Sequence, residues 1–487
     1  MMFILRNVLC VLSFVLFSSV AEAGSKAHFN KKQVLAIQQG IEQIVASVDP
    51  NVHIGIEVVS LTTGKTIYAH NAGHLFMPAS TMKLITGAAA LEILGSNYRF
   101  LTKIYADGPI EKGTLKGNLW IKGSGDPEFS TASLEDLVFQ LKLKGIQRIQ
   151  GNIYIDRSDF DGVAQGPGWT WDDGAVDWNS PLDALTINHS CVNICVKPNA
   201  CCDLPAEVHV QPKTSYITVE NHALTAEKSE NLQAERRWRT KENIIDVNGS
   251  IVKEQEIQKF MVPVELPHLY TASLFCDLLD QNGIKFKGAI EEKTIGSDLA
   301  ELASYASRPL FEMVVEMMKE SDNLIADTLF KKIGQRTFEA PGSWQNGLEA
   351  VNSFLKDKVG IDPANTVIVD GSGLSRYNLL SPHQINALLI WVDRQCPSSA
   401  EFMASLPISG VDGTLKNRMT DPAIKGKVRA KTGSLMGVST LAGYATTEKG
   451  EKIAFSIMMS GFTKKTSEYK LKIEDQILDL FIKKIQH

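Results

Sequence analysis

The sequence predicts an α+β fold in which an antiparallel sheet flanked by helices is interrupted by a large, mainly β insertion. Both ends of the chain carry amphipathic helix patterns, with apolar residues three or four apart at 33–48 and 471–485. Near the C-terminus, three strand-like runs follow one another: 427–434, 438–446 and 452–460. From 99 to 267 the pattern changes to strands, turns and short helices. We therefore expect the two ends to form one domain around an inserted middle.

The chain begins with the pattern of an export signal. Arg6 precedes an apolar run from Val8 to Val20, and A-E-A at 21–23 is the small-x-small pattern of a signal peptidase site. The apolar run is shorter than the roughly 20 residues that a membrane-spanning helix needs. We therefore expect residues 1–23 to be removed. The mature protein is then exported to the periplasm or cell-wall space, soluble or with at most peripheral membrane contact.

Composition excludes some classes of function. Of the 487 residues, 44% are hydrophobic, which is enough for packed cores and argues against a disordered chain. The formal net charge of -5 provides no overall attraction to nucleic acid. The basic cluster Arg236, Arg237 and Arg239 is interpreted as an exposed strand or loop. No nucleic-acid partner is expected.

Cysteines crowd into one short segment: Cys191, Cys195, Cys201 and Cys202. In an oxidising compartment this crowding predicts at least one disulfide within the segment, although the sequence does not fix the connectivity. His189 beside the cluster makes zinc the alternative, but the spacing is irregular for a zinc site. Cys276 and Cys396 either pair or stay free. We expect no metal and no cofactor.

The first chemical motif follows a predicted hairpin at 53–70 and reads P-A-S-T-M-K-L-I-T at 78–86. Apolar residues continue as a helix to about Leu94. Ser80 and Lys83 are three positions apart, so on a helix they lie on one face, one turn apart. A serine hydroxyl needs a neighbour that takes its proton, and a lysine kept neutral by burial or by another cation can do so. The motif therefore predicts a nucleophile beside its base.

The next motif, at Ser321, lies 321 − 80 = 241 positions downstream, too far for one loop in a compact domain. Strand-like and helical segments fill this distance, and a helix at 268–279 is predicted to lead back to the first domain. We therefore expect one domain at 24–98 plus 268–487, interrupted by an inserted part at 99–267.

Two further triplets follow S-x-x-K in order, S-D-N at 321–323 and K-T-G at 431–433. Together these motifs are the signature of penicillin-binding proteins and class A β-lactamases. Three longer contexts extend the match: G-S-G-D-P (123–127), D-G-S-G-L-S-R (370–376) and G-T-L (413–415). The sequence resembles class C low-molecular-mass penicillin-binding proteins, the D-alanyl-D-alanine carboxypeptidase and endopeptidase family. The resemblance implies a β-lactamase/transpeptidase-like domain with two small domains in the insertion.

The resemblance also implies roles for the motif residues. Ser80 attacks the substrate and Lys83 takes its proton. Ser321 relays a proton to the leaving amine, and Asn323 orients Lys83 and donates to the substrate amide. The backbone N–H groups of Ser80 and Ser434 form the oxyanion hole.

Other residues are expected to bind substrate. Lys431 and Thr432, followed by Gly433, would hold the free carboxylate of a peptide ending in D-alanine, and the charge of Lys431 would lower the pKa of Lys83. In the segment G-W-T-W-D-D, Asp173 matches the family position that binds a diaminopimelate amine, although a turn aspartate is the equal alternative. The remaining candidates are an aromatic beside Asp173 and two residues of the D-G-S-G-L-S-R turn: Trp178, Leu374 and Arg376.

The implied function is a serine-type D-alanyl-D-alanine carboxypeptidase and endopeptidase that acts on peptidoglycan peptides and is acylated by β-lactams at Ser80. A serine β-lactamase is the nearer alternative, but no E-x-x-L-N sequence lies between Asn323 and Lys431. A non-catalytic β-lactam sensor or wall-binding protein is the alternative from another class. The chain has no G-x-S-x-G elbow and no H-E-x-x-H motif, which argues against an α/β-hydrolase or a zinc peptidase.

Overall fold

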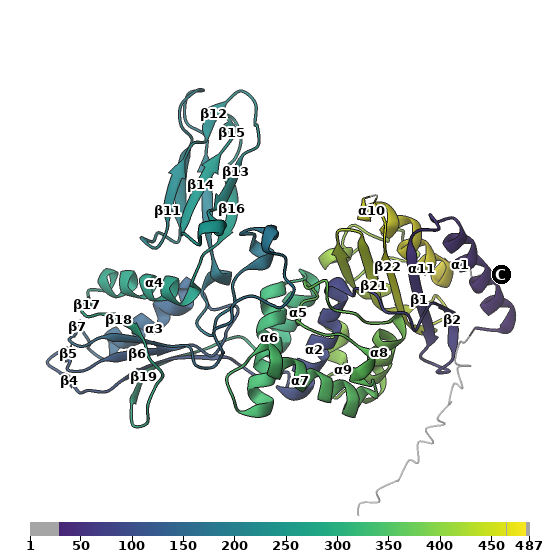
Figure 1. The fold of residues 1–487 in the computed structure, drawn as a ribbon, viewed down its shortest axis with the longest axis horizontal. Helices are drawn as coiled ribbons and strands as arrows, with labels where there is room; N and C mark the ends of the chain where they lie inside the picture. The colour runs from purple at the N-terminus through teal and green to yellow at the C-terminus, as the bar shows by residue number, and fades with distance from the viewer. Residues whose placement is uncertain (1–28, 464, 484–487) are drawn as a thin grey trace, which may run out of the picture.

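A computed structural model describes residues 29–463 and 465–483, and Figure 1 shows two parts that lie next to each other. One part holds both ends of the described chain, and the middle of the sequence forms the other. The predicted α+β class is confirmed. The export signal predicted at residues 1–23 lies outside the described residues. No helix within the described ranges is long and apolar enough to cross a membrane.

A five-stranded antiparallel sheet forms the centre of the first part, with the order β2-β1-β22-β21-β20. Its strands are β1 (His53–Ser60), β2 (Thr66–His70), β20 (Val428–Leu435), β21 (Val438–Thr446) and β22 (Lys452–Ser460). Strands from the two ends of the chain pair directly, because β1 lies beside β22. The strands β1, β21 and β22 are buried on both faces, which explains why they read as apolar runs. β20 is an edge strand, so one side of its backbone is free for other partners.

Helices cover both faces of this sheet (Figure 1). One face packs against helices from the two chain ends: α1 (Lys31–Ala46), α10 (Thr466–Tyr469), a π-helix at Lys470–Asp475 and α11 (Gln476–Lys483). The amphipathic pattern predicted at 471–485 is therefore helical as far as Lys483, and its apolar residues pack on the sheet. The other face carries a larger helical layer: α2 (Met82–Ile93), α5 (Leu310–Lys319), α6 (Asn323–Phe338), α7 (Trp344–Phe354), α8 (Pro382–Gln395) and α9 (Ser399–Ser405).

The inserted part has a first lobe built from two sheets, with the orders β18-β8-β6-β3-β19 and β17-β7-β5-β4. Its strands are β3 (Leu101–Ala106), β4 (Ile110–Glu111), β5 (Thr114–Leu115), β6 (Leu119–Lys122), β7 (Arg148–Ile149), β8 (Ile153–Asp156), β17 (Lys285–Phe286), β18 (Ile290–Glu292) and β19 (Ala300–Ala306). Helices α3 (Thr131–Leu143) and α4 (Pro267–Gln281) bury their apolar residues in the core of this part.

The structure corrects the predicted boundary at 267/268. Strands β17, β18 and β19 pair with β7, β8 and β3, so the chain stays in the insertion until Ala306. Helix α4 therefore belongs to the insertion and does not lead straight back to the first domain. This boundary could not be predicted from apolar patterns, because β17 and β18 are only two and three residues long and carry no buried residue.

The second lobe is an arm of short strands that extends away from the rest of the chain in Figure 1. It contains three sheets, β10-β9-β16, β11-β14-β13 and β12-β15. The strands are β9 (Cys191–Lys197), β10 (Glu207–Gln211), β11 (Thr218–Asn221), β12 (Leu224–Ala226), β13 (Gln233–Arg236), β14 (Ile244–Asn248), β15 (Ser250–Val252) and β16 (Gln258–Pro263). One hydrophobic cluster runs through both lobes, so the arm shares its core with the first lobe.

The disulfide predicted within 191–202 is not formed, because all the cysteines of the described residues are free. Cys191 and Cys195 lie on the same strand, β9. A strand rises about 3.3 Å per residue, so four positions separate their Cα atoms by roughly 13 Å. A disulfide needs Cα atoms within about 7 Å. Strand geometry therefore keeps these two thiols apart, a constraint that crowding in the sequence did not reveal.

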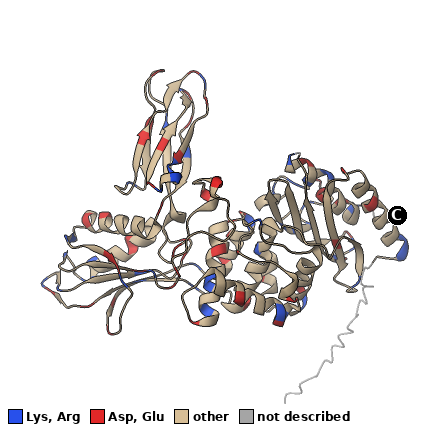
Figure 2. Cartoon of the chain, viewed as in Figure 1, with Lys and Arg blue, Asp and Glu red and all other residues tan. Residues whose placement is uncertain are grey.

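Charged residues of both signs are interspersed in both parts of the chain (Figure 2). The predicted exposure of the arginine cluster is wrong for Arg236, which is only 6% exposed. Its Nε donates to the Pro263 carbonyl oxygen at 2.9 Å, and its guanidinium pairs with Glu265 at 3.1 Å. The cluster therefore contains a structural ion pair, which composition alone did not distinguish from a solvated surface.

Candidate active site

Ser80 lies on a single 3₁₀ turn, Ala79–Thr81, that leads directly into the buried helix α2. Ala79 has a φ of 47°, a left-handed conformation that costs energy for a residue with a side chain. Ser321 has the same kind of conformation, with a φ of 65°. The backbone is therefore strained directly before Ser80 of the S-x-x-K motif and at Ser321 of the S-D-N motif, where the chemistry is expected.

Two glycines allow the other motifs to approach the Ser80 turn. A Cβ on Gly433 would lie 2.1 Å from Thr440 Oγ1 and 2.9 Å from the Pro78 carbonyl oxygen. A Cβ on Gly373 would lie 1.8 Å from the Ala79 carbonyl oxygen. The K-T-G strand and the D-G-S-G turn therefore pack directly against the turn that carries Ser80. This contact explains why both motifs need glycine at these positions.

Lys83 is fully buried, and its Nζ contacts three oxygens. It lies 3.0 Å from Ser80 Oγ, 2.6 Å from Asn323 Oδ1 and 2.8 Å from the Ser372 carbonyl oxygen. Burial lowers its pKa from 10.5 to about 8, against the opposing effect of nearby aspartates. A substantial neutral fraction near pH 8 suits a general base.

Two causes of a low pKa at Lys83 were expected, burial and the charge of Lys431. Burial is the largest cause for Lys83, whose other causes are aspartates that raise the pKa. Repulsion between the two lysines affects Lys431 instead. Burial first, and then the charges of Lys83 and Lys470, hold the pKa of Lys431 well below its ordinary value. Lys431 is fully buried, and its Nζ donates to Ser321 Oγ at 2.9 Å and to the Thr432 carbonyl oxygen at 3.0 Å.

The S-D-N triplet lies at a break between helices α5 and α6. Asp322 caps α6, because its Oδ1 accepts a hydrogen bond from the Ile325 N–H at 2.8 Å. Asn323 Oδ1 accepts from Lys83, and its Nδ2 donates to the Trp178 carbonyl oxygen at 2.9 Å. The Asn323 amide is thus held from both sides, by the base and by the insertion.

Sequence analysis missed Asp327, which is fully buried behind Lys83. Its Oδ1 accepts from the N–H groups of Gly371 and Ser372 at 2.8 and 3.0 Å, and the Ser372 carbonyl oxygen accepts from Lys83. Burial and then Asp370 raise the pKa of Asp327 to about 8. Asp327 follows Asn323 by four positions on α6, so the two share a helix face, the one signal that could have identified it.

The backbone direction of β20 can be read from its upstream residues. The Val428 N–H donates to Ser409 Oγ at 3.2 Å and the Ala430 N–H to the Pro407 carbonyl oxygen at 3.0 Å, both away from β21. N–H groups alternate sides along a strand, so the Ser434 N–H points to the same free edge. This direction is the one that a backbone oxyanion hole at Ser434 requires.

A cavity of about 470 Å³ opens above Ser80. It brings together eight predicted site residues: Ser80, Asp173, Trp178, Ser321, Asn323, Leu374, Arg376 and Ser434. Four others, Lys83, Lys431, Thr432 and Gly433, are buried and are not among its lining residues. Thr432 Oγ1 donates to Thr414 Oγ1 at 2.9 Å, which connects the K-T-G strand to the G-T-L context.

The insertion forms one wall of this cavity. Asp173 lies on a short 3₁₀ turn and accepts a hydrogen bond from Thr170 Oγ1, so it lines the cavity and also takes part in a local turn. Trp178 is 44% exposed. Arg376 Nη1 donates to the Met436 carbonyl oxygen at 3.2 Å, which joins the D-G-S-G-L-S-R turn to the end of β20.

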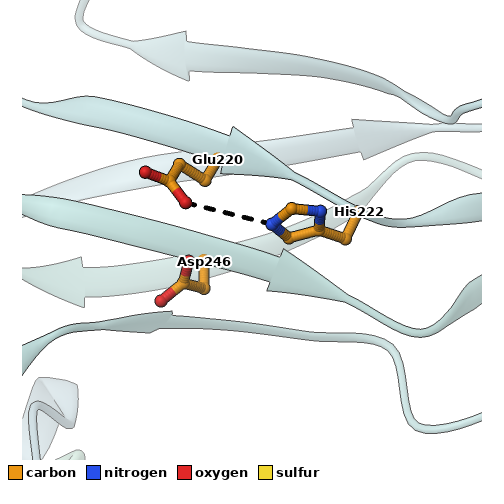
Figure 3. A group of neighbouring side chains, drawn as sticks. All are labelled: Glu220, His222 and Asp246. Atoms are coloured by element: carbon orange, nitrogen blue, oxygen red, sulfur yellow. Dashed lines mark ion pairs between the residues drawn. The ribbon is translucent and has the colours of Figure 1, made fainter.

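A second group of polar side chains lies in the arm, where Glu220, His222 and Asp246 face one another (Figure 3). His222 Nε2 lies 4.0 Å from Glu220 Oε2. Arg237 already pairs with both carboxylates, and this pairing lowers the pKa of Asp246. Arg237 therefore compensates part of the negative charge that would attract a cation, and the group is an ion-pair network.

The helix-flanked antiparallel sheet, with S-x-x-K, S-D-N and K-T-G meeting at its edge, defines a serine acyl-transfer enzyme of the β-lactamase/transpeptidase type. The chain belongs to the D-Ala-D-Ala carboxypeptidase 3 (S13) family, whose model matches residues 37–483. The prediction of a class C low-molecular-mass penicillin-binding protein, a serine-type D-alanyl-D-alanine carboxypeptidase, is thereby confirmed.

Relatives and solved structures agree with this assignment. The chain is 32% identical to the D-alanyl-D-alanine carboxypeptidase DacB of Haemophilus influenzae, over 86% of this chain and 88% of the relative. It is 34% identical to the D-alanyl-D-alanine carboxypeptidase of Actinomadura sp. strain R39, over 84% and 77%. The crystal structure of penicillin binding protein 4 (dacB) from Haemophilus influenzae matches with a TM-score of 0.80 and 29% identity, over 91% of this chain and 98% of that one. That protein has also been solved in complex with a β-lactam.

Proposed function

We propose that this protein removes the terminal D-alanine from peptidoglycan stem peptides, and cleaves crosslinks of the same chemistry, through an acyl-enzyme on Ser80. The contact that carries the proposal is the one between Lys83 Nζ and Ser80 Oγ, 3.0 Å apart at the base of the cavity. A buried amine with a pKa of about 8 beside a half-buried serine that lines the cavity is the arrangement that serine activation needs.

Acylation begins when Ser80 Oγ attacks the amide carbon and its proton passes to Lys83. The backbone N–H groups of Ser80 and Ser434 stabilise the charge on the carbonyl oxygen. When the C–N bond breaks, Ser321 gives its hydroxyl proton to the leaving amine and regains one from Lys431, its hydrogen-bond partner. The low pKa of Lys431 favours this donation. The products are an ester on Ser80 and free D-alanine.

Deacylation returns both protons to their starting places. A water molecule attacks the ester carbon and gives up a proton through Ser321 to Lys431. The ester C–O bond then breaks, and Lys83 returns its proton to Ser80 Oγ. Asn323 holds Lys83 in place in both half-reactions, because its Oδ1 lies 2.6 Å from Nζ. It remains fixed by the Trp178 carbonyl oxygen.

Substrate recognition uses both walls of the cavity. On the K-T-G side, the exposed Ser434 hydroxyl directly after the motif lines the cavity and is available to a terminal carboxylate. Lys431 and Thr432 are buried, and the Thr432 hydroxyl already donates to Thr414 Oγ1, so Lys431 acts through Ser321 and not by touching the carboxylate itself. On the insertion side, Asp173 is available to a free amine of the peptide and Arg376 to a second carboxylate, with Leu374 and Trp178 as apolar walls.

We further propose that the protein works outside the cytoplasm, in the periplasm or cell-wall space. The export-signal pattern at residues 1–23 supports this location. The proposed substrate supports it as well, because crosslinked peptidoglycan lies outside the cytoplasmic membrane. N-terminal sequencing of the intact mature protein should find a first residue near Gly24.

The test combines two measurements on the full mature chain. A fluorescent penicillin should label Ser80, and a peptide ending in D-Ala-D-Ala should release D-alanine, while Ser80→Ala should do neither and keep its fold. Labelling without release of D-alanine would instead support a β-lactam sensor. Rapid loss of the label, with hydrolysed penicillin as product, would support a β-lactamase. Mass analysis of digested muropeptides then measures the balance of carboxypeptidase against endopeptidase activity.

A further inference from the structure

A lysine from the C-terminal segment reaches the edge of the active-site cavity. Lys470, at the start of the π-helix Lys470–Asp475, donates from Nζ to Ser434 Oγ at 2.6 Å. Ser434 is exposed and lines the same cavity as Ser80. A residue almost four hundred positions after the nucleophile thus contacts the residue that follows the K-T-G motif.

This contact determines what the Ser434 hydroxyl can do. An ammonium group has donors but no acceptor, so Ser434 Oγ must be the acceptor in the pair. The hydroxyl hydrogen of Ser434 is then left for another partner. Because the side chain lines the cavity, that hydrogen is available to an anionic group of the substrate.

The positive charge of Lys470 also lies at the edge of the cavity, beside Ser434. Among the ion pairs of the described ranges, none includes Lys470. The acidic residues that follow it are engaged elsewhere. Arg418 pairs with Glu474 at 2.8 Å and with Asp475 at 2.6 Å, and Glu474 also accepts from Ser439 Oγ. Lys470 contributes to the low pKa of Lys431, which shows that its field extends into the site.

We propose that Lys470 is a positioning residue that determines the preference of this enzyme for peptides ending in a free carboxylate. It orients the Ser434 hydroxyl as a donor to that carboxylate and adds positive charge where the buried Lys431 cannot reach. The inference rests on the proposed function, since the carboxylate is that of the terminal D-alanine.

The experiment compares two peptides, one ending in D-Ala-D-Ala and the other in its C-terminal amide, which lacks the negative charge. Lys470→Met should lower kcat/KM for the acid about ten- to a hundredfold, the range for a lost hydrogen bond to a charged group, and change the amide less than about twofold. Lys470→Arg, which keeps the charge and a donor, should recover most of the loss. Lys472→Met is the matched control, because Lys472 lies two positions away and pairs with Glu468 instead of Ser434.

A double variant tests whether Lys470 acts through Ser434. Ser434→Ala keeps the backbone N–H and removes the hydroxyl, so Lys470→Met in that background should lose much less on the acid than it does in the parent. Full additivity of the two losses would refute action through Ser434.

The outcomes separate this inference from the function on which it rests. A parent enzyme that cleaves neither peptide, releasing neither D-alanine from the acid nor D-alaninamide from the amide, overturns the proposed function. An active parent with equal losses on both peptides, or with no loss for Lys470→Met, overturns the role of Lys470. If Lys470→Met does not fold, Lys470→Arg and Ser434→Ala decide the question: an unchanged preference for the acid in Ser434→Ala refutes the inference.

Discussion

The buried position of Lys83 makes the rate of acylation depend on pH in a defined way. In its proposed role as general base, Lys83 would act only when its amine is neutral, and its pKa lies at about 8. The neutral fraction is then about 10% at pH 7, about half at pH 8 and about 90% at pH 9. We expect the second-order rate constant for acylation to rise about tenfold from pH 7 to pH 9 and to level off above that. A lysine with its ordinary pKa of 10.5 would give a rise of about a hundredfold over the same range, without a plateau.

The assay measures labelling by a fluorescent penicillin from pH 6 to pH 10, with circular dichroism at each pH to show that the fold persists. Lys83→Ala should acylate slowly and without this midpoint, because the titrating base is gone. A rate that still rises tenfold per pH unit at pH 9.5 would show that burial does not lower the pKa of Lys83 as argued. A rate that is flat across the range would show that another group is the base.

Three further predictions concern neighbours of the same site. Asp327→Asn removes the largest charge effect that raises the pKa of Lys83, so the midpoint of the acylation profile should move to lower pH; a midpoint that stays or rises would contradict this. Gly433→Ala should reduce penicillin labelling by more than about a hundredfold, because the new methyl would lie 2.1 Å from Thr440 Oγ1, and labelling at the parent rate would show that the strand can shift. Lys431→Ala should lower kcat/KM by a similar factor for the acid and the amide peptides, because Lys431 bonds to Ser321 and is buried away from the cavity. A loss of kcat/KM confined to the acid would instead show that Lys431 binds the carboxylate.

Much of the catalytic domain could be predicted from the sequence because its elements have strong local patterns. The strands β1, β21 and β22 begin and end where the apolar runs do, since both faces of each are buried. The order of the S-x-x-K, S-D-N and K-T-G motifs identified the site, and the cavity brings eight of the predicted residues together. Sequence patterns succeed here because both the core and the chemistry depend on particular side chains at fixed spacing.

Features that depend on tertiary contacts could not be predicted in this way. The end of the insertion at Ala306 depends on strand pairing across the sequence, and two of the strands involved, β17 and β18, are short and carry no apolar pattern. Asp327 and Lys470 have ordinary sequence neighbours, and their importance comes from what lies beside them in space. The same holds for Arg236, which reads as a surface residue until its partner Glu265 is known.

The insertion is part of the catalytic site and not an independent appendage. The Trp178 carbonyl oxygen accepts from Asn323 Nδ2, and the Asn323 Oδ1 accepts from Lys83, so one amide connects the insertion to the base. His189, on a stretch of three residues with positive φ, lies 3.5 Å from the Asp322 carboxylate through its Nδ1. Residues 321–323 are thus held between α2 on one side and the insertion on the other. Because Asn323 can face Lys83 in only one orientation when both contacts are made, the insertion fixes the geometry of the base as well as one wall of the cavity.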